Sequence, residues 1–219
     1  MLRAFTHRLP QAFAACYARG RFLWHLLAIL VTFLLVSSGF DWWFFEHTRS
    51  AALYPLIMLA GIGGFFIPVF ASVGLYIAGE WRHKEKDLLV RAGTAVAQAS
   101  IVALVITSIY KVFTGRTQPE FLTDFSATDM SHAFHLGFFQ NGVFWGWPSS
   151  HAAVAVAGAV ALSLVWRSAP VRAAAAVWAA VVSAGAAVGF HWFSDVLAGI
   201  IIGAVAGIAA GERAAARQP

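Results

Sequence analysis

The residues best suited to chemistry are His191 and Asp195, which stand four positions apart in the stretch FHWFSDVLAG, residues 190–199. Side chains at this spacing meet on one face of a helix, so the carboxylate can bond to the imidazole. Such a bond fixes the tautomer of the ring and leaves the other nitrogen free to act as a nucleophile or a base. The spacing therefore predicts an activated histidine at His191, oriented by Asp195.

A second polar group opens the apolar run WPSSHAAVAVAGAVALSLVW, residues 147–166. Pro148 followed by Ser149 and Ser150 is typical of a helix start. A helix N-terminus presents unbonded N–H groups and the positive end of the helix dipole, so it favours anions. We expect the two serines to hold an anion there, and His151 in the first turn to donate a proton to a leaving oxygen.

The third polar group is YKVFTGRTQPEF, residues 110–121, which carries Lys111 and Arg116. These cations suit a phosphate group, which Arg can bind with two parallel hydrogen bonds. Together the three groups predict phosphoryl transfer, in which His191 attacks phosphorus while the cations and serines stabilise the phosphate oxygens. His151 would protonate the leaving alkoxide and then activate water. Because fixed cations would do the work of a metal ion, we predict no metal and no other cofactor.

Each of these residues also has a simpler interpretation when it is taken alone. His191 could be an anchor at the membrane interface, and Lys111 could extend its ammonium group to the membrane surface. The serines could serve only as helix caps, and Asp195 could only favour the dipole of the next helix. These separate roles do not explain why all the residues occur on one predicted membrane face, so we favour a shared site.

The composition indicates a membrane protein. Of the 219 residues 60% are hydrophobic and only 11% are charged, which is typical of helices that cross a bilayer. We expect an all-α, polytopic fold in one domain, residues 1–219, with six transmembrane helices. Their approximate bounds are 22–44, 52–78, 89–112, 149–166, 172–190 and 195–211. The last two are rich in Ala and Gly, which favours packing inside the bundle.

The basic residues predict the orientation of this bundle. Most of the 15 Lys and Arg residues fall in four segments on one side: residues 1–21, the connections after the second and fourth spans, and the C-terminus. By the positive-inside rule that side is cytoplasmic, and the net charge of +5 then reflects topology and not nucleic-acid binding. The long connection between the third and fourth spans, about residues 113–148, lies on the outer face, as do all three polar groups.

The polar groups resemble those of the type 2 phosphatidic acid phosphatase superfamily, whose members are integral-membrane lipid phosphatases. The family pattern has three parts. The first is a Lys, six further residues and then Arg-Pro, and the second is Pro-Ser-Gly-His. The third is Ser-Arg, five further residues, a His, three further residues and an Asp. Here residues 148–151 read Pro-Ser-Ser-His, and His191 and Asp195 stand at the family spacing. The resemblance covers about residues 85–211, the expected catalytic core, and it implies a phosphohistidine intermediate at an outward-facing site.

Two departures from the family pattern, both at its arginines, bear on phosphate binding. Gln118 stands where the family has its first Arg, although Pro119 is kept, and Arg116 could substitute for it. The second family Arg would fall at Gly185. A hydrogen bond to a charged partner contributes about 1.5–3 kcal/mol, so we expect weaker phosphate binding or an altered substrate. Gln118 is counted with Lys111, Arg116 and the serines as a candidate phosphate-binding residue.

These observations predict a metal-independent phosphatase that hydrolyses a lipid-linked phosphate monoester or pyrophosphate. Its partners would be membrane lipids, with a phospholipid or a polyprenyl phosphate as substrate, and no nucleic acid; the oligomeric state stays open. We expect it in a bacterial cytoplasmic (inner) membrane, with the site facing the periplasm or exterior. Two alternatives remain: a lipid phosphotransferase using the same phosphohistidine, and a non-catalytic lipid-binding relative.

Overall fold

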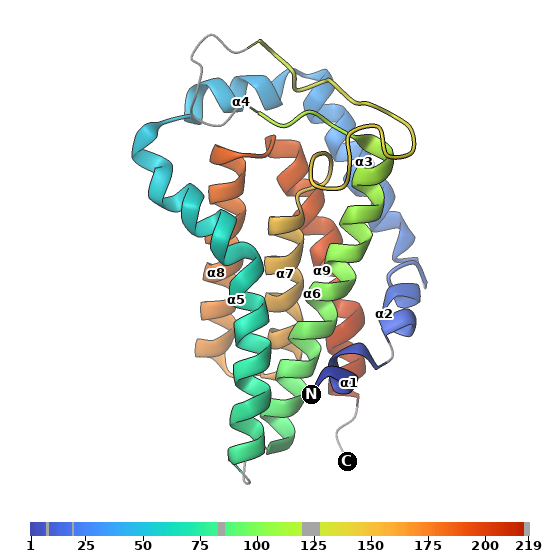
Figure 1. Cartoon of the computed structure of the whole chain (residues 1–219), viewed down its shortest axis with the longest axis vertical. Coiled ribbons are helices and arrows are strands. Elements are labelled where there is room, and N and C mark those ends of the chain that lie inside the picture. Colours follow the sequence, from blue (N-terminus) through green and yellow to red (C-terminus); the bar gives the residue numbers. More distant parts are fainter. Residues whose placement is uncertain (8, 19, 83–85, 120–127, 217–219) are drawn as a thin grey trace.

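A computed structural model describes residues 1–7, 9–18, 20–82, 86–119 and 128–216, and every regular element within these ranges is helical. Figure 1 shows a long bundle, with α4 lying across one end and α1 near the other. In chain order the elements are α1 (Leu2–Thr6), α2 (Leu9–Ala15), α3 (Phe22–Ser37), α4 (Phe40–Thr48), the 3₁₀-helix η1 (Ala51–Leu53), α5 (Tyr54–Trp81), α6 (Lys86–Thr114), α7 (Ser150–Val165), α8 (Ala169–Gly189) and α9 (Phe193–Ala215).

The longest helices indicate an integral membrane protein, and the predicted all-α class is confirmed. Among the described residues, four helices are long and apolar enough to cross a bilayer: Ala51–Trp81, α6, α8 and α9. The bent pair α3 and α4 would be a fifth span if it crosses as one unit. The predicted count of six is not confirmed, because α7 has only 16 residues and a full span needs about 20.

The predicted first span, residues 22–44, is two helices in the structure. α3 ends at Ser37, and α4 begins at Phe40 and turns away by 72°. Gly39 between them has a φ of +73°, a left-handed conformation that glycine adopts without steric cost. The turn places α4 across the end of the bundle, above α8 and α9 (Figure 1). Asp41 in the first turn of α4 is thereby fully buried.

A row of glycines brings α9 against α7. A Cβ atom added at Gly199, Gly203 or Gly207 would lie within 3.0 Å of a backbone oxygen of α7 or its N-cap residue Ser149. Small residues at such spacing let two helices touch along their backbones. The contact supports the predicted interior position of α9, whose span is 67% buried, whereas α8 is only 39% buried and lies further out.

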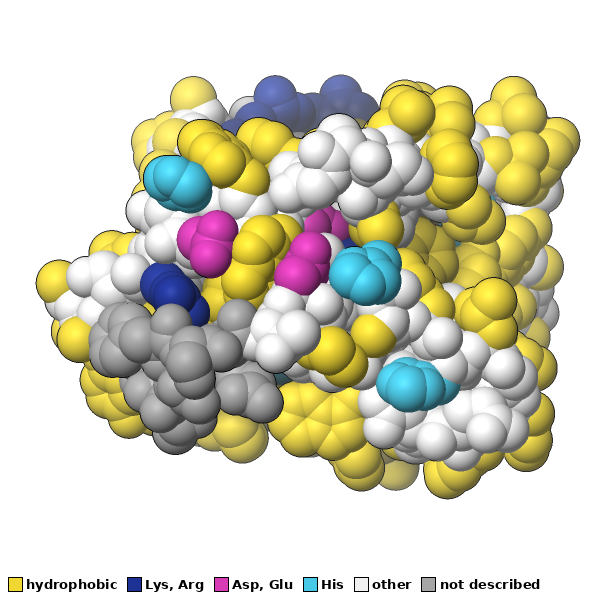
Figure 2. All heavy atoms as spheres, turned by 90° about the horizontal axis from the view of Figure 1, so that it is seen from above, with side chains coloured by type: hydrophobic (Ala, Val, Ile, Leu, Met, Phe, Trp, Pro, Cys, Tyr) yellow, Lys and Arg dark blue, Asp and Glu magenta, His cyan; other side chains and the backbone are white. Residues whose placement is uncertain are grey.

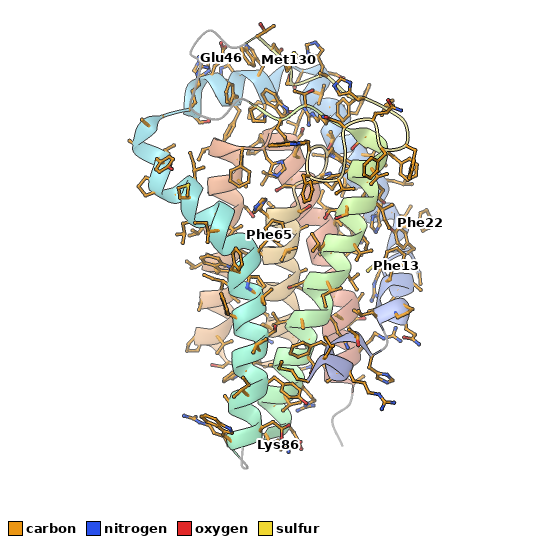
Figure 3. All side chains as sticks on the ribbon, viewed as in Figure 1. Phe13, Phe22, Glu46, Phe65, Lys86 and Met130 are labelled. Atoms are coloured by element: carbon orange, nitrogen blue, oxygen red, sulfur yellow. The ribbon has the colours of Figure 1, made fainter. Side chains whose placement is uncertain are left out.

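The N-terminal segment, residues 1–21, contains α1 and α2, which pack against α6, and α2 also packs against α9. Gln98 on α6 donates from Nε2 to the carbonyl oxygens of Ala4 at 3.1 Å and His7 at 2.8 Å. Arg21 forms an ion pair with Glu212 near the end of α9 at 2.6 Å. We call this end of the bundle, marked by Lys86 in Figure 3, the basic end. We call the opposite end, marked by Glu46 and Met130, the α4 end.

Candidate active site

The three predicted polar groups meet at the α4 end of the bundle. Thr114 ends α6, Ser150 begins α7 and Phe193 begins α9, and Figure 1 shows these three helix ends side by side. The Ser149 N–H donates to the carbonyl oxygen of Asp195 at 3.0 Å. The groups therefore come together as the charge-based topology predicts.

His191 lies in the short connection between α8 and α9 and is 4% exposed. Its Nδ1 is 3.4 Å from Oδ2 of Asp195, so the predicted contact is present. The two residues do not share a helix face as predicted, because α9 begins at Phe193, after His191. Burial lowers the pKa of His191, while the Asp195 hydrogen bond acts in the opposite direction and nearby Lys111 adds to the lowering. The imidazole is therefore neutral at physiological pH, the state in which a ring nitrogen can attack an electrophile.

His151 faces His191 from the first turn of α7. Their ring centroids are 6.0 Å apart and the rings are inclined by 61°. Phe65 on α5, labelled in Figure 3, packs edge-on against His151 at 4.3 Å, and Phe190 packs on it at 4.7 Å. Gly64 on α5 makes room for the ring, because an added Cβ would lie 3.2 Å from it.

Lys111 and Ser150 complete the polar part of this group. The Lys111 side chain is buried, and its Nζ donates to the carbonyl oxygen of Phe144 at 3.2 Å. The Ser150 hydroxyl lies 2.9 Å from the hydroxyl of Thr107 on α6. Ser149 is the N-cap of α7, where its hydroxyl accepts from the Ala152 N–H at 3.3 Å. The first N–H groups of α7 have no partner within the helix and can bind an anion.

A cavity of about 630 Å³ joins these residues. Its polar lining consists of His151, His191, Lys111, Ser108, Ser150 and Gln118. Its apolar lining includes Phe65, Leu104, Phe144, Trp145 and Phe190. Phe144 and Trp145 are largely exposed, and Figure 2 shows many apolar side chains over this end of the molecule. Exposed aromatic side chains suit the boundary between lipid and water.

Arg116 is placed differently from the sequence prediction. It is fully buried but does not line the cavity. Its Nη1 donates to Asp195 at 2.5 Å and its Nη2 to Asp41 at 2.7 Å, and both Nε and Nη2 donate to the carbonyl oxygen of Ser131. The expected contact with phosphate is thus replaced by a contact with the carboxylate that orients His191.

Asp41 is the residue of this network that sequence reasoning missed. Besides Arg116, it accepts from the Ser194 N–H at 2.8 Å and from the Ser194 hydroxyl at 2.5 Å. It lies near the end of the predicted first span, residues 22–44. An acidic residue within an apolar span is expensive unless it has a buried partner, and that signal could have marked Asp41 as a functional candidate.

The two departures from the family pattern have distinct structural settings. Gln118 lines the cavity and donates from Nε2 to the Gly146 carbonyl at 3.0 Å and more weakly to Asp195 at 3.5 Å. Gly185 packs against α5, where an added Cβ would lie 2.6 Å from Ala60 Cβ and from the Leu56 carbonyl oxygen. α5 therefore occupies the space that an arginine side chain at position 185 would need.

Long apolar helices around two facing histidines define an all-α integral membrane protein with a buried candidate active site. A protein-family comparison matches residues 90–214 to the PAP2 superfamily, so the chain belongs to this superfamily, the type 2 phosphatidic acid phosphatases. Its members are phosphatases, which indicates phosphatase-type activity on phosphate esters. Searches of curated proteins and of solved structures found no match. The matched range contains both histidines, whereas Asp41 lies outside it.

Proposed function

We propose that the protein is a metal-independent lipid phosphatase that works through a phosphohistidine on His191. The observation that carries this proposal is the shared cavity: His191, His151 and Lys111 line one space whose remaining walls are largely apolar. A phosphate group can lie between the two histidines, and an acyl or prenyl chain can lie along the aromatic and aliphatic walls. This combination favours a phosphate ester attached to a lipid.

In the first step, Nε2 of His191 attacks phosphorus and the bond between phosphorus and the ester oxygen breaks. His151, protonated in the presence of the phosphate dianion, gives its proton to the departing oxygen. Asp195 accepts the hydrogen bond from Nδ1 of His191 and stabilises the charge that forms on the ring. Lys111 and the first N–H groups of α7 stabilise the charge on the phosphate oxygens.

In the second step, the now neutral His151 takes a proton from water, and the resulting hydroxide attacks phosphorus. The bond between phosphorus and nitrogen breaks, and inorganic phosphate leaves with His191 in its neutral form. Arg116 acts on both steps through Asp195, since its Nη1 donates to the carboxylate oxygen Oδ1 while His191 contacts Oδ2. We therefore assign Arg116 and Asp41 as positioning residues.

The proposed substrate is a phosphate monoester or pyrophosphate on a lipid at the outer surface of a bacterial cytoplasmic membrane. Candidates are phosphatidic acid, phosphatidylglycerol phosphate, polyprenyl pyrophosphate and the phosphates of lipid A. Among the described residues, Lys111 is the one Lys or Arg that lines the cavity. Apolar contacts must then supply much of the binding free energy, so the lipid forms should bind far better than their soluble headgroups.

The test is phosphate release by the purified protein in detergent with EDTA present. Phosphatidic acid, phosphatidylglycerol phosphate, polyprenyl pyrophosphate and soluble glycerol 3-phosphate would be compared, with and without an acceptor lipid. The control for His191→Ala is His47→Ala, which changes an exposed histidine on α4. We expect release from at least one lipid, retention of activity in EDTA, and loss of activity only in His191→Ala.

Other results would decide against the proposal. Transfer of labelled phosphate to the acceptor lipid in place of water would identify a phosphotransferase. Lipid binding without phosphate release, unchanged in His191→Ala, would identify a non-catalytic relative. Activity that EDTA abolishes would contradict the metal-independent mechanism.

A further inference from the structure

A second cavity, of about 570 Å³, lies at the basic end of the bundle. Its walls come from α1, α5, α6 and α9, together with His7 after α1. Arg3, Arg91 and Arg213 reach it from three different helices, far apart in the sequence. No Asp or Glu is among the described residues that line it, so its interior is strongly positive.

Two acidic residues at this end are already paired with other cations, and a third, Asp87 in the first turn of α6, forms no ion pair with a cavity arginine within the described ranges. Glu80 pairs with Lys86 at 2.9 Å, and Glu212 pairs with Arg21 at 2.6 Å. Within the described ranges, none of the three cavity arginines has an ion-pair partner. Arg91 donates to the Asp87 carbonyl at 3.0 Å and Arg213 to the Gln11 carbonyl at 3.2 Å, which uses only one of the five N–H donors of each guanidinium.

The cavity has a defined wall, which distinguishes it from a general basic surface. Gln98 holds α1 in place through its bonds to the carbonyls of Ala4 and His7. Phe5 of α1 packs edge-on against Tyr76 of α5 at 5.6 Å. The positive-inside rule accounts for basic residues at this end, but Arg167 and Arg172 lie at the same end and line no part of the cavity.

We propose that this cavity binds the headgroup of an anionic phospholipid, a phosphodiester such as that of phosphatidylglycerol. Guanidinium groups bind phosphate oxygens in pairs of parallel hydrogen bonds. Basic pockets between transmembrane helices are suited to anionic headgroups, because the lipid chains can remain along the apolar helix surfaces. The site is separate from the proposed reaction, since a phosphodiester is neither a phosphate monoester nor a pyrophosphate.

The experiment uses native mass spectrometry to count the ligands bound to the full-length protein, purified in neutral detergent. The protein is titrated with phosphatidylglycerol, phosphatidylcholine or soluble glycerol 3-phosphate. The test variant is Arg91→Gln/Arg213→Gln. Its matched control is Arg167→Gln/Arg172→Gln, which removes the same charge from the same end outside the cavity. Lys111→Gln serves as a second control, because it alters the only Lys or Arg that lines the active-site cavity in the described structure.

We expect one phosphatidylglycerol to bind more tightly than phosphatidylcholine. Loss of two arginines should weaken this binding about tenfold or more, while both control variants bind as the unaltered protein does. Equal weakening in the two double variants would mean a diffuse surface charge and would overturn the proposal. Weakening in Lys111→Gln would place the lipid in the active-site cavity, and equally tight binding of soluble glycerol 3-phosphate would indicate a site for free anions. Each of these results contradicts a headgroup site at the basic end.

Discussion

The two ends of the bundle each hold a cavity and buried or exposed arginines near it, but the arginines are used in opposite ways. At the α4 end, Arg116 is fully buried and paired with both Asp41 and Asp195. At the basic end, Arg3 and Arg213 are exposed, and neither has an ion-pair partner among the described residues. Buried charges need partners and hold a fixed geometry, which suits a reaction. Exposed, unpaired arginines can adapt to an incoming anion, which suits a binding site.

The largest expected effect is that of His191→Ala, which should alter the α4 end of the bundle and leave the basic end unchanged. His191→Ala removes the proposed nucleophile, so the rate of phosphate release should fall by at least about a thousandfold. Phosphatidylglycerol binding at the basic end should not change. Steady-state kinetics and the lipid titration measure the two effects, and residual activity within tenfold of the unaltered protein would rule out His191 as the nucleophile.

Asp41→Ala tests whether the buried network positions the reaction centre. Nη2 of Arg116 and the N–H and hydroxyl of Ser194 would lose an acceptor. Breaking such a buried ion pair costs about 3–5 kcal/mol of folding free energy, which should appear as a lower thermal transition. The protein that remains folded should show a reduced kcat with little change in KM, because Asp195 would be less well oriented.

Two further variants make the Asp41 result specific. Asp41→Asn keeps an acceptor oxygen and should recover part of both stability and kcat. Glu46→Ala changes an exposed acid on the same helix and should leave the free energy of unfolding within about 1 kcal/mol of that of the unaltered protein. If Asp41→Ala behaves like Glu46→Ala, Asp41 has no positioning role.

Lys111→Gln sharpens the comparison between the two sets of cations. Loss of one charged hydrogen bond to phosphate corresponds to about 1.5–3 kcal/mol, so KM for the lipid should rise by roughly tenfold to a hundredfold. Lys86→Gln, at the basic end, is the matched control. An unchanged KM in Lys111→Gln would mean that the α7 N-terminus alone holds the phosphate.

The smallest effect is a shift in pH dependence. Burial favours the neutral form of His191 and lowers its pKa below the usual value near 6.5. The nucleophile therefore stays neutral as the pH falls, and the acidic limb of kcat/KM assigned to His191 should lie below that value. As the pH falls, His191 is protonated in the unfolded chain at a higher pH than in the folded protein. The contribution of neutral His191 to the folding free energy is therefore complete above about pH 6.5 and declines as the pH falls below that value. An acidic limb above pH 7 would contradict this assignment.

Much of the site could be predicted from the sequence because it depends on local spacing and on charge topology. The four-residue interval indicates the contact between His191 and Asp195, although His191 lies just before α9 and not on it. The serine before α7 indicates a helix cap. The charges of the connections indicate on which side of the membrane each helix end lies, and they place all three polar groups on the same side. The family resemblance, confirmed over residues 90–214, adds the class of reaction.

The remainder depends on partners that are distant in the sequence. The charge of Arg116 indicates an anionic partner, but hydropathy and spacing cannot tell a phosphate from two carboxylates. Asp41 lies 75 positions away from Arg116, on a helix whose direction depends on the single left-handed residue Gly39. From the sequence, the first span resembles one continuous helix, and neither hydropathy nor spacing indicates the network of Asp41 and Arg116 that supports Asp195.

The glycine row between α7 and α9 has a consequence for the tolerance of the reaction centre. A Cβ atom added at Gly199 would lie 2.5 Å from the carbonyl oxygen of Ser149. The close approach of the two backbones therefore sets the distance between α7, which carries His151, and the start of α9, which follows His191. One extra methyl group at position 199 would wedge the helices apart and widen the gap that a phosphorus atom must bridge, although neither imidazole had been altered.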